Sequence, residues 1–185
     1  YIWGRFDKLN GWRSKVSNYS LILGAAIHMI DLIIWMLEKN PESIYVKANK
    51  ILTKNTNFKK ESFVIMLLKF KNGVIAKITA NSTDNYSHFH EIKIFEKKKT
   101  IISNILGQKK LNKINGKTKL SNFKGKYPDK NNRYVLLSNF IKHLKNNNKK
   151  EKNLIMRENF DLMNICFSGI RSLRTNKEIR INYLK

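Results

Sequence analysis

The tripeptide Lys71-Asn72-Gly73 and the segments beside it constrain the fold of this chain more than any other feature. An Asn-Gly pair adopts the positive φ angles that tight hairpin turns require. Residues 63–70 and 74–81, which flank the turn, are rich in apolar and β-branched side chains. The pattern predicts two strands that are antiparallel neighbours in one sheet.

Further strands are predicted from alternating or β-branched stretches. In residues 43–51, apolar Ile44 and Val46 alternate with more polar residues, which is the period-2 signal of a half-buried strand. The remaining strands are expected at residues 89–95, 100–105 and 179–183. Residues 107–128 are polar and contain three glycines, so we expect a long excursion with at most short strands.

Helical spacing of apolar residues predicts two C-terminal helices, at residues 133–146 and 154–174, with a hydrophilic loop at 147–153 between them. An earlier helix starts near Gly24 and is stopped by Pro41. The order of elements predicts an α+β fold: an open, mostly antiparallel sheet with helices packed on one face. We expect a single domain over residues 1–185, a length that supports a substantial core.

The helix after Gly24 places polar side chains on one stripe, because residues three or four apart share a helix face. This stripe holds Gly24, His28, Asp31 and Trp35. An adjoining apolar stripe, expected to face the core, consists of Ile27, Ile30, Ile34 and Leu37. An imidazole is thereby set beside a carboxylate at the margin of the core. Considered alone, a single His in such a place is more often structural than catalytic.

The formal net charge of +24 would attract phosphate groups. However, lysine outnumbers arginine by 30 to 7, whereas recognition of phosphate and bases favours the planar fork of arginine. The lysines are also spread along the whole chain, as on a solvated surface. A basic, non-catalytic binding module for an acidic partner or nucleic acid is therefore the alternative reading, and nucleic acid is not the expected partner.

The single cysteine, Cys166, permits no intrachain disulfide and fits a reducing, cytoplasmic setting. The longest apolar run, residues 32–37 with its flanks, is too short and too polar to cross a bilayer, so no membrane association is expected. The chain begins without a charged leader and apolar segment, so no signal peptide is expected.

Four segments together resemble the C-terminal half of the Gfo/Idh/MocA oxidoreductases, the family of glucose-fructose oxidoreductase and inositol dehydrogenase. They are GRFDKLNGWRSKVSNYSLILGAAIHMIDLIIWML, SIYVKANKI, LLKFKNGVIAKITA and HFHEIKIF. The resemblance runs over residues 1–100 and more loosely to residue 181. It implies a substrate domain with an open sheet face for homo-oligomer formation. It also implies NAD(P)-dependent hydride transfer on a sugar, sugar derivative or polyol.

The resemblance further implies that NAD or NADP is bound mainly by an N-terminal Rossmann domain that this chain lacks. The eight glycines include no Gly-x-Gly-x-x-Gly turn, which would cradle the dinucleotide phosphates. The Glu-Lys-Pro motif that carries a catalytic Lys in the family is also missing from the sequence. We therefore expect the fragment alone to be inactive.

By resemblance, His28 is the catalytic residue, which transfers a proton or orients the substrate carbinol beside the nicotinamide. Imidazole titrates near neutrality and suits this role. In many relatives an Asp stands four residues before this His, but here the position is Gly24, which cannot accept a proton. Asp31 matches a family Asp; it would orient the imidazole or, alternatively, bond to backbone or to an Arg.

Four more residues are expected near the substrate. Arg13 is a candidate anchor for an anion or hydroxyl, with a structural ion pair as the alternative, and Tyr19 is a candidate hydrogen-bonding wall. Tyr86 or His88 would line the cleft, because family members use the loop before this strand for substrate contacts. A His-x-His pair such as His88 and His90 is weak support for a metal, so none is expected.

Overall fold

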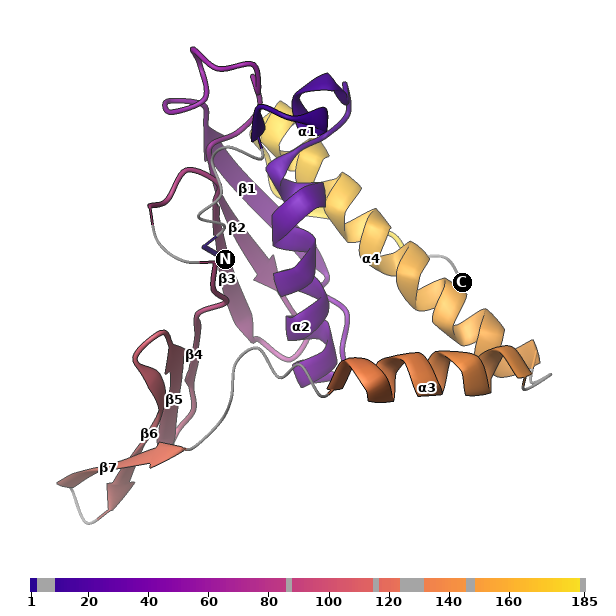
Figure 1. Cartoon of the computed structure of the whole chain (residues 1–185). Helices are drawn as coiled ribbons and strands as arrows, with labels where there is room; N and C mark the ends of the chain where they lie inside the picture. Colours follow the sequence, from indigo (N-terminus) through magenta and orange to yellow (C-terminus); the bar gives the residue numbers. More distant parts are fainter. Residues whose placement is uncertain (3–8, 86–87, 115–116, 124–131, 146–148, 184–185) are drawn as a thin grey trace. The chain divides into compact units, whose positions relative to one another are not determined.

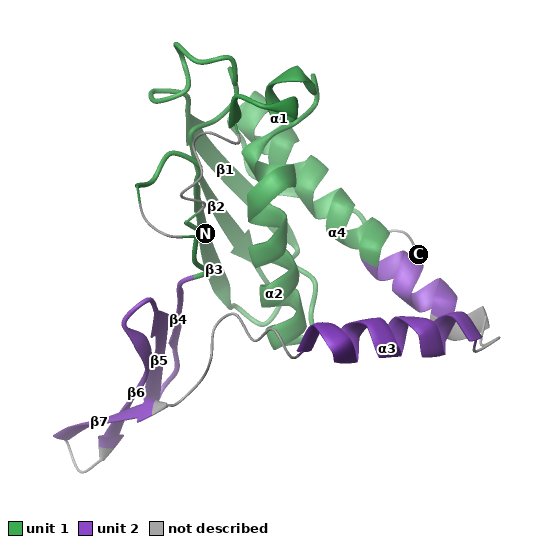
Figure 2. Cartoon of the chain, viewed as in Figure 1, with its two compact units in different colours: residues 1–90, 159–185 green, residues 91–158 purple. Residues whose placement is uncertain are grey.

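The computed structural model describes the chain except for residues 3–8, 86–87, 115–116, 124–131, 146–148 and 184–185. The described chain divides into two compact units: unit 1 is residues 1–90 with 159–185, and unit 2 is residues 91–158 (Figure 2). Each unit has its own four-stranded sheet. The single domain expected from the sequence stays a prediction.

Unit 1 is built on an antiparallel sheet with strand order β3-β2-β1-β8 (Figure 1). The strands are β1 (Ser43–Asn49), β2 (Phe63–Lys69), β3 (Ile75–Asn81) and β8 (Ile179–Arg180). The predicted hairpin is confirmed, because Met66 of β2 pairs with Ile78 of β3 and Gly73 in the turn has a φ of 82°. Strand β8 is shorter than the predicted strand at residues 179–183.

One face of this sheet carries the core of unit 1. Its buried residues alternate along the strands: Ile44, Val46, Val64, Met66, Leu68, Ile78 and Ala80. Helix α2 (Ile27–Leu37) covers this face together with residues 159–175, the part of α4 (Lys149–Thr175) that belongs to unit 1 (Figure 1). A Cβ added to Gly169 of α4 would lie 3.1 Å from Cδ1 of Ile44, so the helix backbone packs closely on the sheet. The predicted fold class, with helices on one face of an open antiparallel sheet, is confirmed.

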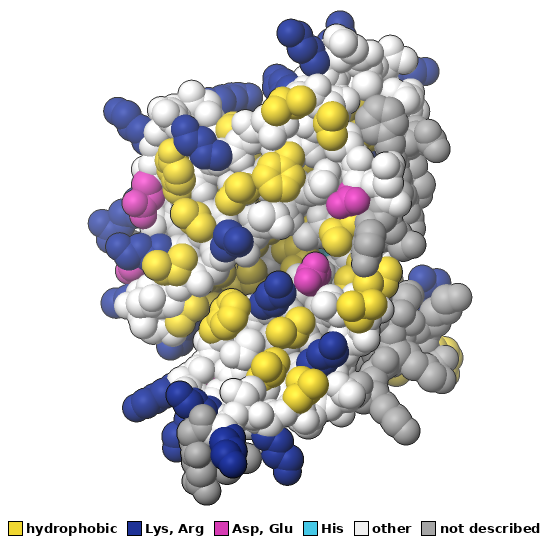
Figure 3. All heavy atoms as spheres, turned by 90° about the vertical axis from the view of Figure 1, so that its left-hand side faces the viewer, with side chains coloured by type: hydrophobic (Ala, Val, Ile, Leu, Met, Phe, Trp, Pro, Cys, Tyr) yellow, Lys and Arg dark blue, Asp and Glu magenta, His cyan; other side chains and the backbone are white. Residues whose placement is uncertain are grey.

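No helix in the described part of unit 1 covers the other face of its sheet. The side chains of Ile65, Leu67 and Ile75 are 36%, 40% and 69% exposed on this face. Lys69 and Lys77 lie on the same face of the sheet, since Lys69 pairs with Ile75 and Lys77 with Leu67, and both lysines are exposed. A space-filling view of one side of the chain shows hydrophobic side chains set among many cations and few acids (Figure 3).

The helix that carries His28 begins with a π-helical segment, η2 (Ile22–Ala26), which the sequence did not predict. The hydroxyl of Ser20 accepts a hydrogen bond from the Leu23 amide (3.2 Å) and caps the first turn. The amide of Ile27 bonds to the carbonyl of Ile22, five residues back. A short helix, α1 (Trp12–Lys15), precedes this region.

The buried residues of this helix differ from the predicted apolar stripe. The buried residues are Ile22, Ala25, Ala26, Met29 and Ile30. Of the predicted apolar stripe, only Ile30 is fully buried, whereas Ile27, Ile34 and Leu37 are half-buried. The stripe lies wholly in α2, after the π segment, and the buried residues of α2 are Met29 and Ile30. The helix ends at Leu37, and Glu38 then adopts a left-handed conformation with a φ of 50°.

Unit 2 contains an antiparallel sheet with strand order β4-β5-β6-β7. The strands are β4 (Ile92–Phe95), β5 (Lys99–Asn104), β6 (Gly107–Ile114) and β7 (Lys117–Phe123). The prediction of an excursion at residues 107–128 was therefore wrong for β6 and β7. Backbone hydrogen bonds form the ladder whatever the side chains, and the polar composition of these strands hid them. Strand β4 also starts later than the predicted residue 89.

The two C-terminal helices are confirmed as α3 (Asn132–Lys145) and α4. Helix α4 starts at Lys149, so residues 149–153, which were predicted as loop, are helical. None of the helices in the described part of the chain is long and apolar enough to cross a membrane.

Candidate functional site

Three histidines of unit 1 gather around the ring of Tyr1. The centroid of the Tyr1 ring lies 5.9 Å from that of His28, 5.3 Å from that of His88 and 4.7 Å from that of His90. The rings of His88 and His90 are 5.3 Å apart, and those of His28 and His90 are 6.5 Å apart. The fold thus brings the helix histidine and the His-x-His segment together.

Backbone hydrogen bonds hold this cluster in place. The backbone nitrogen of Tyr1 donates to the Thr79 carbonyl (2.7 Å), and the Asn81 amide donates to the Tyr1 carbonyl (3.0 Å), at the end of β3. Ile2 and Phe89 exchange two further bonds of 2.9 and 3.0 Å. The extended pairing at Phe89 turns its two neighbouring histidines toward the same side, as predicted.

The histidines differ in their surroundings. Burial lowers the pKa of His90 to about 4, and the neighbouring His88 and His28 lower it further. His90 is therefore a neutral imidazole at neutral pH. His28 lies on the exposed side of α2. The cluster consequently offers an accessible imidazole beside a neutral one, which suits proton exchange with a bound hydroxyl group.

The described residues contain no group of three or more His, Cys, Asp or Glu side chains that could hold a metal ion. Cys166 is buried in α4, and burial raises the pKa of its thiol to about 12. A thiol of this kind is not a nucleophile near neutral pH.

Tyr19 and Arg13 belong to a second aromatic group, just before the His28 helix. The ring of Tyr19 makes edge contacts with Trp12 (6.0 Å between centroids) and with buried Phe58 (5.8 Å). The guanidinium carbon of Arg13 lies 4.4 Å from the centroid of the Trp12 ring. The hydroxyl of Tyr19 lies directly against Gly24, within 1.9 Å of where a Cβ would be.

The other predicted site residues are placed differently. Asp31 is exposed on α2, and its side chain makes no hydrogen bond or ion pair with the described part of the chain. Tyr86 lies outside the described residues. Sequence reasoning did not select Tyr1 or Phe58, because a single aromatic residue carries no pattern that marks it as the centre of a cluster.

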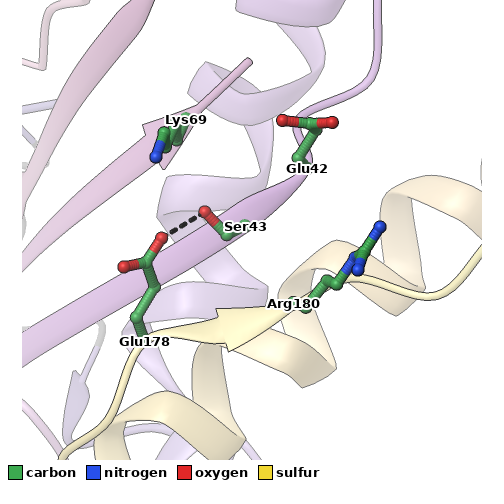
Figure 4. Close-up of a pocket in the computed structure, with 5 residues that line it drawn as sticks. All are labelled: Glu42, Ser43, Lys69, Glu178 and Arg180. Atoms are coloured by element: carbon green, nitrogen blue, oxygen red, sulfur yellow. Dashed lines mark hydrogen bonds between the residues drawn. The ribbon is translucent and has the colours of Figure 1, made fainter. Parts of the chain in front are cut away.

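A pocket at the other end of the unit 1 sheet does not share these residues. It is lined by Glu42, Ser43, Lys69, Glu178 and Arg180 (Figure 4). The Ser43 hydroxyl donates to the Glu178 carboxylate. Ser43 pairs with Lys69 at the start of β1, whereas Tyr1 lies beside the far end of β3. Its mixed charges and distance from the histidines make the pocket a poor candidate for the reaction.

Residues 2–102, which make up more than half of the chain, match the GFO/IDH/MocA C-terminal domain. The chain belongs to this family. The domain contributes the whole of the three-histidine cluster, and the match ends within β5. No curated protein matches the chain.

The GFO/IDH/MocA C-terminal domain fold recurs in solved structures. Levoglucosan dehydrogenase in complex with NADH has a TM-score of 0.77 at 10% identity, covering 100% of this chain and 57% of that one. Its complex with NADH and levoglucosan has a TM-score of 0.75 at 10% identity and the same coverage. An NAD-binding protein from Listeria innocua has a TM-score of 0.65 at 14% identity, covering 92% and 50%. The chain spans about half the length of these proteins.

Proposed function

We propose that this chain is the substrate-binding and oligomerisation domain of an NAD(P)-dependent oxidoreductase that acts on a sugar, sugar derivative or polyol. The observation that carries the proposal is the accessible His28 imidazole, grouped with Tyr1, His88 and His90 in a domain of an oxidoreductase family. The similarity to levoglucosan dehydrogenase, a sugar dehydrogenase by name, supports a sugar-like substrate.

The dinucleotide does not fit the residues of this chain alone. The sequence lacks a glycine-rich phosphate turn, and the named strands of the described chain pair antiparallel rather than in the βαβ units of a dinucleotide site. NAD or NADP is thus bound mainly by a Rossmann domain outside these residues. Bound there, the dinucleotide would supply the acceptor for the hydride of the substrate carbon.

The residues of this chain bind the substrate and accept the proton of its reacting hydroxyl group. His28 accepts the hydroxyl proton of the alcohol as the carbon–oxygen bond becomes a carbonyl. Neutral His90 adds no competing positive charge beside it. Arg13, Tyr19, Asp31, Tyr86 and His88 are proposed to contact or orient the substrate.

Replacement of the proton acceptor tests this function. In the full-length enzyme, His28→Ala should lower kcat by roughly a hundredfold or more, the usual scale of general acid–base catalysis. The Kd of NAD(P) should barely change, because the dinucleotide is bound elsewhere. The matched variant His143→Ala, on α3, should keep normal turnover. Normal turnover of His28→Ala with a lowered Tm would instead identify a structural histidine.

The coding sequence upstream offers a second test. A glycine-rich turn and a Glu-Lys-Pro motif are expected there, and their absence would favour the basic binding module. We also propose a cytoplasmic location, in keeping with the single reduced cysteine.

A further inference from the structure

The phenol ring of Tyr19 occupies the place of the side chain that Gly24 lacks. A Cβ added to Gly24 would lie 1.9 Å from the Tyr19 hydroxyl oxygen and 2.3 Å from Cζ of the same ring. Non-bonded carbon atoms do not approach so closely, since their optimal separation is about 3.5–4.0 Å. Any side chain at position 24 therefore excludes Tyr19 from its present position.

The Tyr19 ring is held there from several directions. The backbone amide of Tyr19 donates a hydrogen bond to the Val16 carbonyl (3.2 Å), which closes the turn before the helix. Phe58, which is fully buried, meets the ring at 73°, and Trp12 meets it at 85°. Edge-to-face contacts of this kind are favourable for aromatic pairs. These contacts hold the Tyr19 hydroxyl against the helix surface at Gly24.

That point lies on the same face of the helix as His28. In a regular α-helix, a residue four positions on is rotated by about 40° from the first. The π segment Ile22–Ala26 takes more residues per turn, which brings positions 24 and 28 closer to one line. Residues one turn apart have Cβ atoms about 5–6 Å from each other. The Tyr19 hydroxyl therefore lies about one helical turn from His28.

We propose that Tyr19 supplies, from the preceding turn, the polar group that the His28 face lacks at Gly24, and that its hydroxyl forms a hydrogen bond with a hydroxyl group of the substrate. The inference rests on the proposed function. A phenol donates and accepts hydrogen bonds and carries no charge near neutral pH. An ionised carboxylate at this position could only accept a hydrogen bond from a substrate hydroxyl, whereas the phenol can accept one or donate one.

The hydroxyl contact is tested with Tyr19→Phe in the full-length enzyme, with levoglucosan and NAD⁺ as the probe. The variant keeps the ring between Trp12 and Phe58, so we expect a Tm within about 2 °C of the wild type. KM for the sugar should rise roughly tenfold, the effect of losing one hydrogen bond. The matched variant Tyr45→Phe, on β1, should leave KM unchanged. An unchanged KM in Tyr19→Phe overturns the substrate contact.

The exchange between positions 19 and 24 is tested separately by a double-mutant cycle on Tm. Gly24→Ser alone should lower Tm because its Cβ collides with the ring. Combined with Tyr19→Ala, the same serine should be tolerated, so the two effects should be strongly non-additive. Tyr19→Ala combined with Gly73→Ser is the additivity control: the φ of 82° makes Gly73→Ser lower Tm by itself, but no atom lies within 4 Å of a Cβ added there, so the two effects should add. Additive effects in the first pair overturn the exchange.

Failure of the proposed function has a different signature. If the wild-type enzyme binds levoglucosan or L-sorbose in saturation-transfer NMR but forms no NADH from NAD⁺, the proposed hydride transfer fails. In that case the sugar affinity of Tyr19→Phe still decides the inference. If the wild type binds neither sugar, the contact between Tyr19 and a sugar hydroxyl is overturned.

Discussion

The histidines around Tyr1 have the same side chain but different environments, and their chemistry differs accordingly. His90 is half-buried among other aromatic rings, which keeps it neutral well below the pH at which an exposed imidazole is protonated. His28 faces outward from α2 and can exchange protons with whatever binds there. The division resembles an acid–base residue with a neutral neighbour, and burial is its largest cause.

The environment of His90 predicts a pH dependence of stability. Its pKa falls from 6.5 to about 4 on folding, so the unfolded chain binds a proton there at a higher pH than the folded chain. The folded state therefore keeps its full stability with respect to His90 above about pH 6.5, and it loses stability as the pH falls toward 4 because the unfolded chain takes up the proton first. His90→Gln, which does not titrate, should reduce the loss of unfolding free energy between pH 7 and pH 4.5 in urea titrations.

His143→Gln on α3 serves as the control for this measurement and should keep the wild-type pH dependence. Parallel stability curves for the wild type and His90→Gln would contradict the predicted neutral state of His90.

At the scale of elements, helix α4 lies so close to the unit 1 sheet because Gly169 has no side chain there. A Cβ on Gly169 would come within 3.1 Å of Ile44, 3.4 Å of Met66 and 3.5 Å of Val46, all at side-chain atoms. The hydroxyl of Ser172, one turn later, accepts the Val46 amide (3.0 Å) and donates to the Lys177 carbonyl (2.6 Å). The helix is thereby fixed in position along β1.

This packing predicts a cost for filling the space at Gly169. Gly169→Val should lower the free energy of unfolding by about 1–3 kcal/mol, because a branched side chain must push α4 away from the sheet. Helix propensity alone favours valine over glycine, so a loss reports packing. The exposed variant Arg171→Val should change stability by less than about 0.5 kcal/mol. Equal urea midpoints for Gly169→Val and the wild type would refute close packing.

At the scale of the whole molecule, the open sheet face and the net charge of +24 act together. Apolar Ile65 and Leu67 form the middle of that face, and Lys47, Lys69 and Lys77 lie beside them. An exposed apolar patch of this kind is typical of an interaction surface. We expect homo-oligomers to form through this face, with the lysines of two copies repelling each other.

Sedimentation of the full-length enzyme tests this expectation. It should be a dimer or tetramer at micromolar concentration, and association should tighten as NaCl is raised, since salt screens the repulsion between lysines. Leu67→Lys should dissociate the oligomer. Ile51→Lys, at a site 75% exposed beyond β1, should leave it intact. A monomeric wild type at every salt concentration would count against association.

The sequence by itself determined the local parts of this protein. The Asn72-Gly73 turn specified the β2–β3 hairpin, because few residues other than glycine tolerate its φ of 82°. Apolar periodicity located β1, α3 and most of α4, and the combined motifs indicated the family. The polar strands β6 and β7 were not predicted from the sequence, since their pairing depends on backbone groups that every residue carries.

Only the tertiary structure decided how distant residues meet. Tyr1, His28 and His90 are far apart in the sequence, and they come together because β3 pairs with the start of the chain on one side and α2 packs beside it. The sequence showed that position 24 has no side chain, but it did not show that the Tyr19 ring occupies the space where one would lie. Contacts of this kind depend on the shape of the packed fold, which no local pattern encodes.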